Sequence, residues 1–344
     1  MRFTVRSRDF SCLQKGVHRL RAAIVRHPGG PEALQIEEAS LPETPAGWVR
    51  IRVKAIGLSR SEIYARRGDY PEVSFPRVLG TECVGIVDDT SDSALQLGSV
   101  TVALMGGMGR LYDGCYAEYV AVPVTHILPM TTSLSWEVIA ALPKSYLTAY
   151  QALETLDLRA GQTLLIRGGT SSVGLCALTL AKERGARVLA TTRRQNKVAA
   201  LSAAGADAVL LDTGSVEEPV RQMAPEGVSA ALEMIGASTL RDSLLTVAPK
   251  GVICYMGVLG DQNALERFQP LMDIPSGVRL TTYASRGTID AAHCTQLLQQ
   301  IVDGVAIGRY PTHLDRVFPF AQLAEAHRYM EDNRAMGKVV VMAP

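Results

Sequence analysis

The most regular hydrophobic pattern of the chain lies between residues 163 and 212. A short apolar run at 163–166 meets a glycine-rich turn, and an apolar pattern with helical spacing then continues to Lys182. A second short apolar run follows at 187–191. This order predicts strand, turn, helix and strand. In such a parallel crossover the amides at the helix N-terminus lie beyond the first strand, where they can hold the pyrophosphate of a dinucleotide.

The same alternation of short apolar runs and amphipathic segments continues to residue 284. It indicates a parallel sheet with helices on both faces, the α/β class. Six strands would complete a Rossmann-type, doubly wound dinucleotide fold. The predicted elements are a helix at 196–204, a strand at 208–211, a helix at 216–223, a strand at 229–235, a helix at 239–247, and strands at 251–256 and 279–284.

Residues 22–142 show a different pattern. Short valine-rich runs, separated by Gly, Pro, Asp and Ser, predict an antiparallel, partly barrel-like β domain. The segment 135–150 predicts helix, break and helix around Pro143, where the chain passes to the cofactor domain. The runs lie at 20–26, 49–55, 83–87, 99–104 and 116–122; the elements expected after residue 284 are a helix at 289–303, a strand at 316–319, a helix at 320–330 and a strand at 337–341 that rejoins the first domain.

The glycine turn departs from the dinucleotide fingerprint at one place. Gly169 and Gly174 stand at its outer positions, but Ser171 replaces the middle glycine. Serine still allows fairly close backbone approach and adds a hydroxyl donor. The turn by itself is also compatible with an ordinary strand-to-helix connection.

The residues after the second strand predict the cofactor. An NAD site needs an acidic residue about 20 positions beyond the turn, and this stretch contains none. Arg193, Arg194 and Lys197 stand there instead, and cationic donors of this kind suit the 2′-phosphate of NADPH. We therefore expect NADPH rather than NADH. A solvated basic surface loop is the alternative interpretation.

Composition excludes several other classes of protein. The 344 residues suffice for two domains with apolar cores. No apolar stretch approaches the roughly 20 residues that span a bilayer, so no membrane is expected. The net charge is +1, of which residues 1–21 contribute +5 (six basic residues against Asp9) and the rest −4. A mildly acidic body argues against nucleic acid as the main partner.

Residues 1–21 form a basic N-terminal extension. They resemble an organelle transit peptide in being rich in arginine and poor in acids, but a non-native leader or an upstream start codon explains them equally well. The six cysteines contain no CxxC pair and no short cluster. They predict reduced, mostly buried thiols in a cytoplasmic protein.

Several motifs in the same order resemble one family. The resemblance is to the medium-chain dehydrogenase/reductase superfamily, and within it to the zinc-free quinone oxidoreductase branch related to zeta-crystallin. It implies a GroES-like catalytic domain at 22–142 and 286–344, and a Rossmann NADP-binding domain at 143–285. The motifs are at 55–59 with Tyr64, at 68–71, 80–82, 114–119 and 142–150, the turn at 168–174, and the closing 337–340.

The resemblance also identifies the positions at which the zinc-dependent relatives bind their catalytic metal. Those positions carry Ser59, Thr81 and Lys144 in this chain. Hydroxyl groups bind zinc poorly and an ammonium group has no lone pair to offer. The four-cysteine structural zinc lobe is absent from the sequence as well. We therefore expect no metal.

The resemblance implies a set of site residues. Catalytic candidates are Lys144, as a cation replacing the metal, and three tyrosines that could donate hydrogen bonds to the acceptor; for the tyrosines a packing role is the alternative, and for Lys144 an exposed position in solvent. The tyrosines are Tyr64, Tyr70 and Tyr146; the expected cofactor-binding residues are Ser59, Thr148, Gly169, Thr170, Ser171, Ser172, Val173, Gly174, Thr192, Arg193, Arg194, Lys197, Gly257 and Lys338.

Three functions remain open from the sequence. Without a Lewis acid, reduction of a small-molecule quinone or α,β-unsaturated carbonyl (enone) by NADPH is easier than oxidation of an alcohol. An enoyl-thioester or specialised-metabolism double-bond reductase is the nearest alternative. A non-catalytic NADPH-binding sensor or structural protein is the third, because a fold does not establish chemistry. The resemblance further implies a homodimer formed through the far sheet edge at 251–257 and 279–284.

Overall fold

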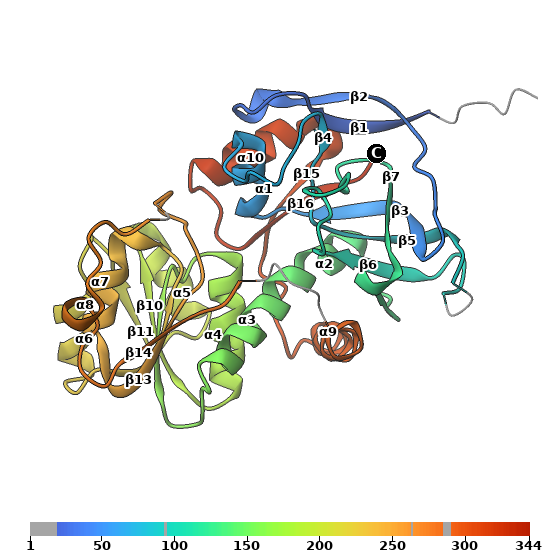
Figure 1. The fold of residues 1–344 in the computed structure, drawn as a ribbon. Coiled ribbons are helices and arrows are strands. Elements are labelled where there is room, and N and C mark those ends of the chain that lie inside the picture. The colour runs from blue at the N-terminus through green and yellow to red at the C-terminus, as the bar shows by residue number, and fades with distance from the viewer. Residues whose placement is uncertain (1–18, 93–94, 263, 285–289) are drawn as a thin grey trace, which may run out of the picture.

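The computed structural model of the chain describes residues 19–92, 95–262, 264–284 and 290–344. Most of the basic N-terminal extension and the first residue of the helix predicted at 289–303 lie outside these ranges. Figure 1 shows two domains with α3 (Pro143–Thr155) between them. No helix in the described part of the chain has the length and apolar character needed to cross a bilayer.

The cofactor domain is built on a six-stranded parallel sheet with the order β11-β10-β9-β12-β13-β14. This is the doubly wound order predicted from the sequence, because the chain starts at the centre and moves first to one edge and then to the other. The strands are β9 (Thr163–Arg167), β10 (Arg187–Thr192), β11 (Ala208–Leu211), β12 (Val228–Glu233), β13 (Val247–Tyr255) and β14 (Arg279–Thr282).

Alternating side chains of β9 divide the two faces of this sheet. Leu164 and Ile166 pack into the core that contains α3 and α4, whereas Leu165 packs into the core beneath α6 and α7. Burial on both faces explains why these strands are almost continuously apolar. The helices are α4 (Ser172–Glu183), α5 (Val198–Ala203), α6 (Glu217–Met223), α7 (Ala237–Leu245) and the short α8 (Pro270–Asp273).

The catalytic domain contains a seven-stranded sheet and a smaller three-stranded one with the order β2-β1-β4. In the larger sheet β7 and the C-terminal β16 pair with different parts of β3, so the chain end returns to this domain as predicted. Its strands pair antiparallel except for β15 with β16. The strands are β1 (Arg19–Val25), β2 (Leu34–Ser40), β3 (Trp48–Gly57), β4 (Arg77–Val78), β5 (Glu82–Thr90), β6 (Val100–Leu104), β7 (Tyr119–Pro123), β8 (Ile127–Pro129), β15 (Leu314–Pro319) and β16 (Lys338–Met342).

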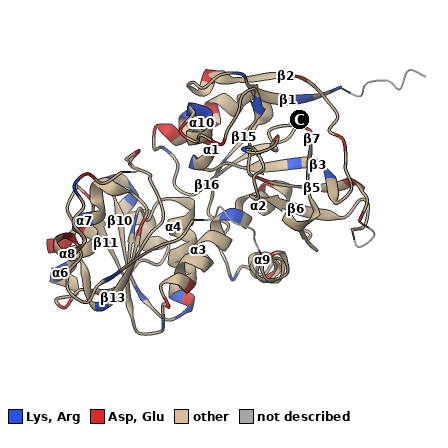
Figure 2. Cartoon of the chain, viewed as in Figure 1, with Lys and Arg blue, Asp and Glu red and all other residues tan. Residues whose placement is uncertain are grey.

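Among the described residues, four helices accompany these sheets. In the view of Figure 2, basic and acidic residues are scattered over both domains, and a basic stretch at the start of α3 lies between them. Strand β1 begins at Arg19, so the fold includes the last residues of the segment predicted as an extension. The helices are α1 (Arg60–Arg67), α2 (Trp136–Ala141), α9 (Ala291–Ala306) and α10 (Leu323–Glu331).

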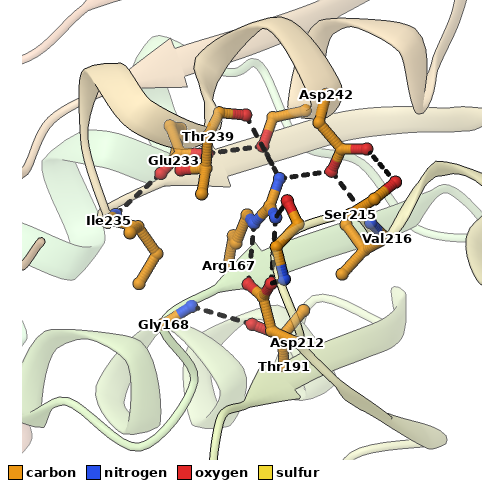
Figure 3. Close-up of polar contacts among 12 residues, drawn as sticks. Arg167, Gly168, Thr191, Asp212, Ser215, Val216, Glu233, Ile235, Thr239 and Asp242 are labelled. Atoms are coloured by element: carbon orange, nitrogen blue, oxygen red, sulfur yellow. Dashed lines mark hydrogen bonds and ion pairs between the residues drawn. The ribbon is translucent and has the colours of Figure 1, made fainter.

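A buried arginine fixes the carboxyl edge of the cofactor sheet. Arg167, the last residue of β9, donates two hydrogen bonds to Asp212 (2.8 and 3.0 Å) and one to Asp242 (2.6 Å), as Figure 3 shows. Glu233, at the end of β12, accepts hydrogen bonds from the amides of Ile235 and Gly236. Because Arg167 immediately precedes the glycine turn, this network holds the turn against the neighbouring strand ends.

Arg167→Met should lower the free energy of unfolding far more than a matched substitution at the surface. It leaves the buried Asp212 and the partly buried Asp242 without their cation, and an unpaired buried charge typically costs about 3–5 kcal/mol in the free energy of unfolding. The control is Arg241→Met, which breaks the exposed pair with Asp273 and should cost less than about 1 kcal/mol. Urea unfolding of both variants measures this, and equal losses would contradict the assignment.

Candidate functional site

A cleft of about 570 Å³ lies between the two domains. Its wall combines the glycine turn and the ends of β10 and β13 with α1, the loop at 105–110 and the start of α3. Most of the predicted site residues line it. Those that do are Ser59, Tyr64, Tyr70, Lys144, Thr148, Thr170, Ser171, Ser172, Val173, Thr192, Arg193, Arg194, Lys197, Gly257 and Lys338.

The glycine turn presents backbone amides to the cleft. Ser171 caps α4: its hydroxyl oxygen accepts the amide hydrogen of Gly174 at 3.0 Å and donates to the carbonyl of Gly168 at 2.9 Å. The hydroxyl expected as a phosphate donor is therefore engaged within the turn. Ser172 and Val173 are the first two residues of α4, and amides at these positions have no acceptor within the helix. These amides and the helix dipole make the anion-binding end of the turn.

Two of the predicted cofactor glycines do not line the cleft. A side chain on Gly174 would approach the carbonyl oxygen of Gly168 to 2.6 Å, and one on Gly169 would meet Ala190 at 3.0 Å. Both glycines permit the close packing of α4 and the turn on the sheet. Their role in the site is to shape the turn.

The three cations after β10 are not equivalent. Lys197 donates to the backbone carbonyls of Ala335 (2.7 Å) and Arg334 (3.1 Å), and Arg194 donates to the carbonyl of Asp332 at 2.9 Å. Burial lowers the pKa of Lys197, and the charge of Arg194 adds to this effect. These two side chains thus join the cofactor domain to the segment after α10. Arg193 is exposed, and its charge contributes to the lowered pKa of Asp212, after Arg167 and the Gly214 amide.

Three hydroxyl groups in the cleft wall are buried without a hydrogen-bond partner among the described residues: those of Ser145, Thr148 and Tyr255. A buried hydroxyl without a partner costs free energy, so these groups are suited to a ligand that supplies one. Thr148 was predicted from the sequence. Ser145 and Tyr255 were missed, because an isolated serine or tyrosine carries no pattern. The sequence could have pointed to them only through their positions, because Ser145 follows Lys144 and Tyr255 ends β13.

Lys144, which the family resemblance matches to a zinc-binding position, lies inside the protein. Its ammonium group donates to the hydroxyls of Thr81 (2.8 Å) and Ser61 (3.0 Å), and Glu62 lies 3.8 Å away. Only 12% of the side chain is exposed. Burial lowers the pKa of Lys144, and the charge of Glu62 opposes this shift. The alternative in which this lysine extends into solvent is therefore wrong.

The residues around Lys144 do not fit a zinc ion. Zinc is held by thiolate, imidazole or carboxylate groups, whereas Ser59, Thr81 and Lys144 offer two hydroxyls and an ammonium. Ser59 caps α1, where its amide donates to Glu62 at 2.6 Å. Across the described residues, no group of three or more His, Cys, Asp or Glu side chains could hold a metal.

The three candidate tyrosines occupy different environments. Tyr64 lines the cleft and donates to the carbonyl of Val258 at 2.7 Å, which joins the two domains. Burial raises the pKa of Tyr64 to about 12. Tyr70 also lines the cleft, and its ring makes a T-shaped contact with the ring of Tyr64. Tyr146 is fully buried, does not line the cleft and donates to the carbonyl of Pro311 at 2.6 Å, so its assignment as a cleft donor is wrong.

Lys338 and Gly257 belong to the frame of the cleft. The ammonium of Lys338 pairs with Glu82, which is fully buried and also accepts the amide hydrogen of Lys144 at 2.7 Å. Gly257 allows the backbone after β13 to pass close to Met234, whose carbonyl oxygen would lie 2.5 Å from an added side chain.

This architecture is that of a two-domain oxidoreductase with a dinucleotide site between its domains. Two family models match the chain: the alcohol dehydrogenase GroES-like domain over residues 45–132 and the zinc-binding dehydrogenase domain over residues 204–341. The chain belongs to the medium-chain dehydrogenase/reductase superfamily, in its quinone oxidoreductase-like branch. This confirms the family inferred from the motifs.

Known relatives differ in what their names describe. The chain is 26% identical to a quinone oxidoreductase of Pseudomonas aeruginosa, over 91% of this chain and 97% of that protein. It is 23% identical to an acryloyl-coenzyme A reductase of Metallosphaera sedula, over 94% and 99%. It is 28% identical to part of a phenolphthiocerol/phthiocerol polyketide synthase subunit of Mycobacterium tuberculosis, of which it spans 15%.

One similar solved structure contains a cofactor. It is a mycobacterial protein complexed with NADPH, 25% identical, with a TM-score of 0.83 over 94% of this chain and 99% of that one. The cleft described above fits a nicotinamide dinucleotide, because it offers helix-terminal amides for phosphates and buried hydroxyls without partners. Zinc, which the name of one family model implies, does not fit the residues present.

Proposed function

We propose that the protein is an NADPH-dependent reductase of quinones or of the activated double bond of enones, and that it works without a metal. The observation that carries the proposal is the ammonium group of Lys144, held inside the cleft by Thr81 and Ser61; the family resemblance matches this residue to a zinc ligand. A fixed positive charge there suits an acceptor whose oxygen becomes negative during reduction.

The residues of the chain have separate tasks in this reaction. When bound, the cofactor would supply a hydride from its nicotinamide ring. The amides of Ser172 and Val173 would hold its pyrophosphate, and Arg193 its 2′-phosphate. Thr148 and Ser145 would bind its amide end, because their hydroxyls are buried without partners. Lys144 would stabilise the negative oxygen of the acceptor, which the cleft would hold beside the nicotinamide ring.

An enoyl thioester remains the nearest alternative acceptor. The resemblance to a protein named acryloyl-coenzyme A reductase supports it, and the chemistry at Lys144 would be the same, since the thioester oxygen also becomes negative. We further propose a cytosolic location, which the five described cysteines, all free and buried, support.

Turnover with a panel of quinones, enones and enoyl thioesters tests the function as a whole. The loss of NADPH absorbance reports the reaction, and fluorescence titration reports cofactor binding separately. We expect reduction of at least one class of acceptor. Binding of NADPH without turnover of any acceptor would contradict the enzyme and favour a non-catalytic sensor.

Arg193→Gln should reduce the preference for NADPH over NADH. Loss of one charge-assisted contact to phosphate corresponds to ~10- to 100-fold in the ratio of the two affinities. Lys197→Gln is the matched control, because this ammonium is already engaged with backbone carbonyls; it should change both affinities alike. Titration of both cofactors measures the ratio, and an unchanged ratio in Arg193→Gln would rule out its assignment.

Lys144→Met should lower kcat on the best acceptor by ~10²–10³ and leave the affinity for NADPH unchanged. In the unmodified enzyme, activity should fall at alkaline pH, because the lysine loses its charge as the pH rises through its lowered pKa. Lys144→Arg should move this fall to higher pH. A Lys144→Met enzyme with near-normal kcat would remove this residue from the mechanism.

We also propose a homodimer formed through the edge of the cofactor sheet. Among the described residues β14 pairs only with β13, and Leu271 and Met272, in the segment that leads to β14, are 97% and 79% exposed. An open strand edge and exposed apolar side chains are each suited to contact with a second copy. Light scattering at micromolar concentration should give twice the chain mass, and Leu271→Asp with Met272→Asp should give monomers. A monomer mass for the unmodified protein would contradict the dimer.

A further inference from the structure

The cleft carries an excess of positive charge that the cofactor does not explain. Asp212 is its only acidic residue among those described, and Arg167 holds that carboxylate. Four of the cations are committed to the protein: Lys338 to Glu82, and the others to backbone or amide groups at residues 330–335. The cations that line the cleft are Arg60, Arg110, Lys144, Arg193, Arg194, Lys197 and Lys338.

Arg110 is the uncommitted cation on the catalytic domain. Its guanidinium lies over the ring of Tyr70, 4.3 Å from the ring centroid, and the side chain is 16% exposed. Glu72 is 3.7 Å away, beyond hydrogen-bond distance, and Nε is buried with no partner in the described part of the chain. A mostly buried guanidinium with this little compensation costs free energy unless another group provides an acceptor.

The protein holds Arg110 beside the reaction site. The amide of Gly109 donates to the carbonyl of Tyr112 at 2.9 Å, and a side chain on Gly109 would lie 2.6 Å from the carbonyl oxygen of Gly80. The next residue, Thr81, is the one that accepts the Lys144 ammonium. The loop that carries Arg110 is therefore packed against the residues just before β5, one of which binds Lys144. This loop belongs to the catalytic domain, whereas the glycine turn belongs to the cofactor domain.

From these observations we propose that the hydride acceptor carries a carboxylate, and that Arg110 binds it while Lys144 faces the reducible carbonyl. This inference rests on the proposed function and specifies its substrate class. An arginine fork matches a carboxylate in two parallel hydrogen bonds, and the Tyr70 ring holds the guanidinium plane in place. A neutral quinone uses the cleft without this contact.

Acetylacrylate and its methyl ester test the proposal, because they share one enone skeleton and differ in the charge. The unmodified enzyme should have the lower KM for the acid. Arg110→Met should raise the KM for the acid by ~10- to 100-fold and that for the ester by less than about 3-fold. Arg60→Met is the matched control: its guanidinium is bound to Met330 and Asn333, so both KM values should change alike.

Glu72→Gln is a second variant, at an exposed residue, and it should change the KM in the opposite direction. It removes the exposed competitor of the substrate carboxylate, and the KM for the acid should fall by about 2- to 5-fold, the range of a weak ion pair. If Arg110→Met raises both KM values alike, or Glu72→Gln leaves that of the acid unchanged, the proposal is overturned. A different result would be that Arg110→Met raises the KM for crotonyl-coenzyme A and leaves the KM values for crotonyl-pantetheine and acetylacrylate unchanged. That result would show that Arg110 binds phosphates and would overturn the carboxylate proposal.

A binding measurement separates this proposal from the proposed function. Levulinate, the saturated carboxylate, should raise the Tm of the enzyme with NADP⁺ bound, and Arg110→Met should abolish that rise while keeping the rise caused by NADP⁺ itself. This result would support the anion site even if no acceptor were reduced. No effect of levulinate on the unmodified enzyme would overturn the anion site, whatever the turnover.

Discussion

The cleft depends on one buried carboxylate. Glu82 has no solvent exposure, and its two oxygens bind the amide of Lys144 and the ammonium of Lys338. It thereby joins β5 of the catalytic domain, the first turn of α3 and the C-terminal β16. An ionised group so deep in the protein is tolerated only because both oxygens have donors, one of them charged. The same contacts set the direction of α3 and bring Lys144 into the cleft.

Polar contacts at the cleft, away from Glu82, also join the two domains. Tyr64 donates to a backbone carbonyl of the cofactor domain, and Lys197 and Arg194 donate to backbone carbonyls in the segment that follows α10. Further polar contacts join the domains away from the cleft, among them Thr179 with His313 and Glu183 with Tyr310. One apolar core cluster also contains residues of both domains, such as Leu104 and Leu164.

The distribution of charge gives the cleft two distinct ends. On the cofactor side the α4 amides and Arg193 suit phosphates, and on the catalytic side Lys144 and Arg110 suit an acceptor with negative oxygens. Between them lie hydroxyls without partners and the ring of Tyr255. Replacing a metal by a lysine changes the chemistry: an ammonium can stabilise developing charge and donate a proton, but it cannot coordinate an alkoxide.

The sequence determined the doubly wound class of the cofactor sheet, the passage between domains at Pro143 and the return of the C-terminus to the first domain, because periodicity and turn residues act locally and the parallel crossover has one hand. It also pointed to Lys144 as a site residue, because the family resemblance matches this position to a zinc ligand. It could not show that Lys197 and Arg194 join α10, that Tyr146 is buried, or that Ser145, Tyr255 and Arg110 line the cleft. Those facts depend on contacts between residues distant in the sequence, such as Lys197 with Ala335 and Tyr146 with Pro311. Only the packing of the two domains decides which side chains reach the same space.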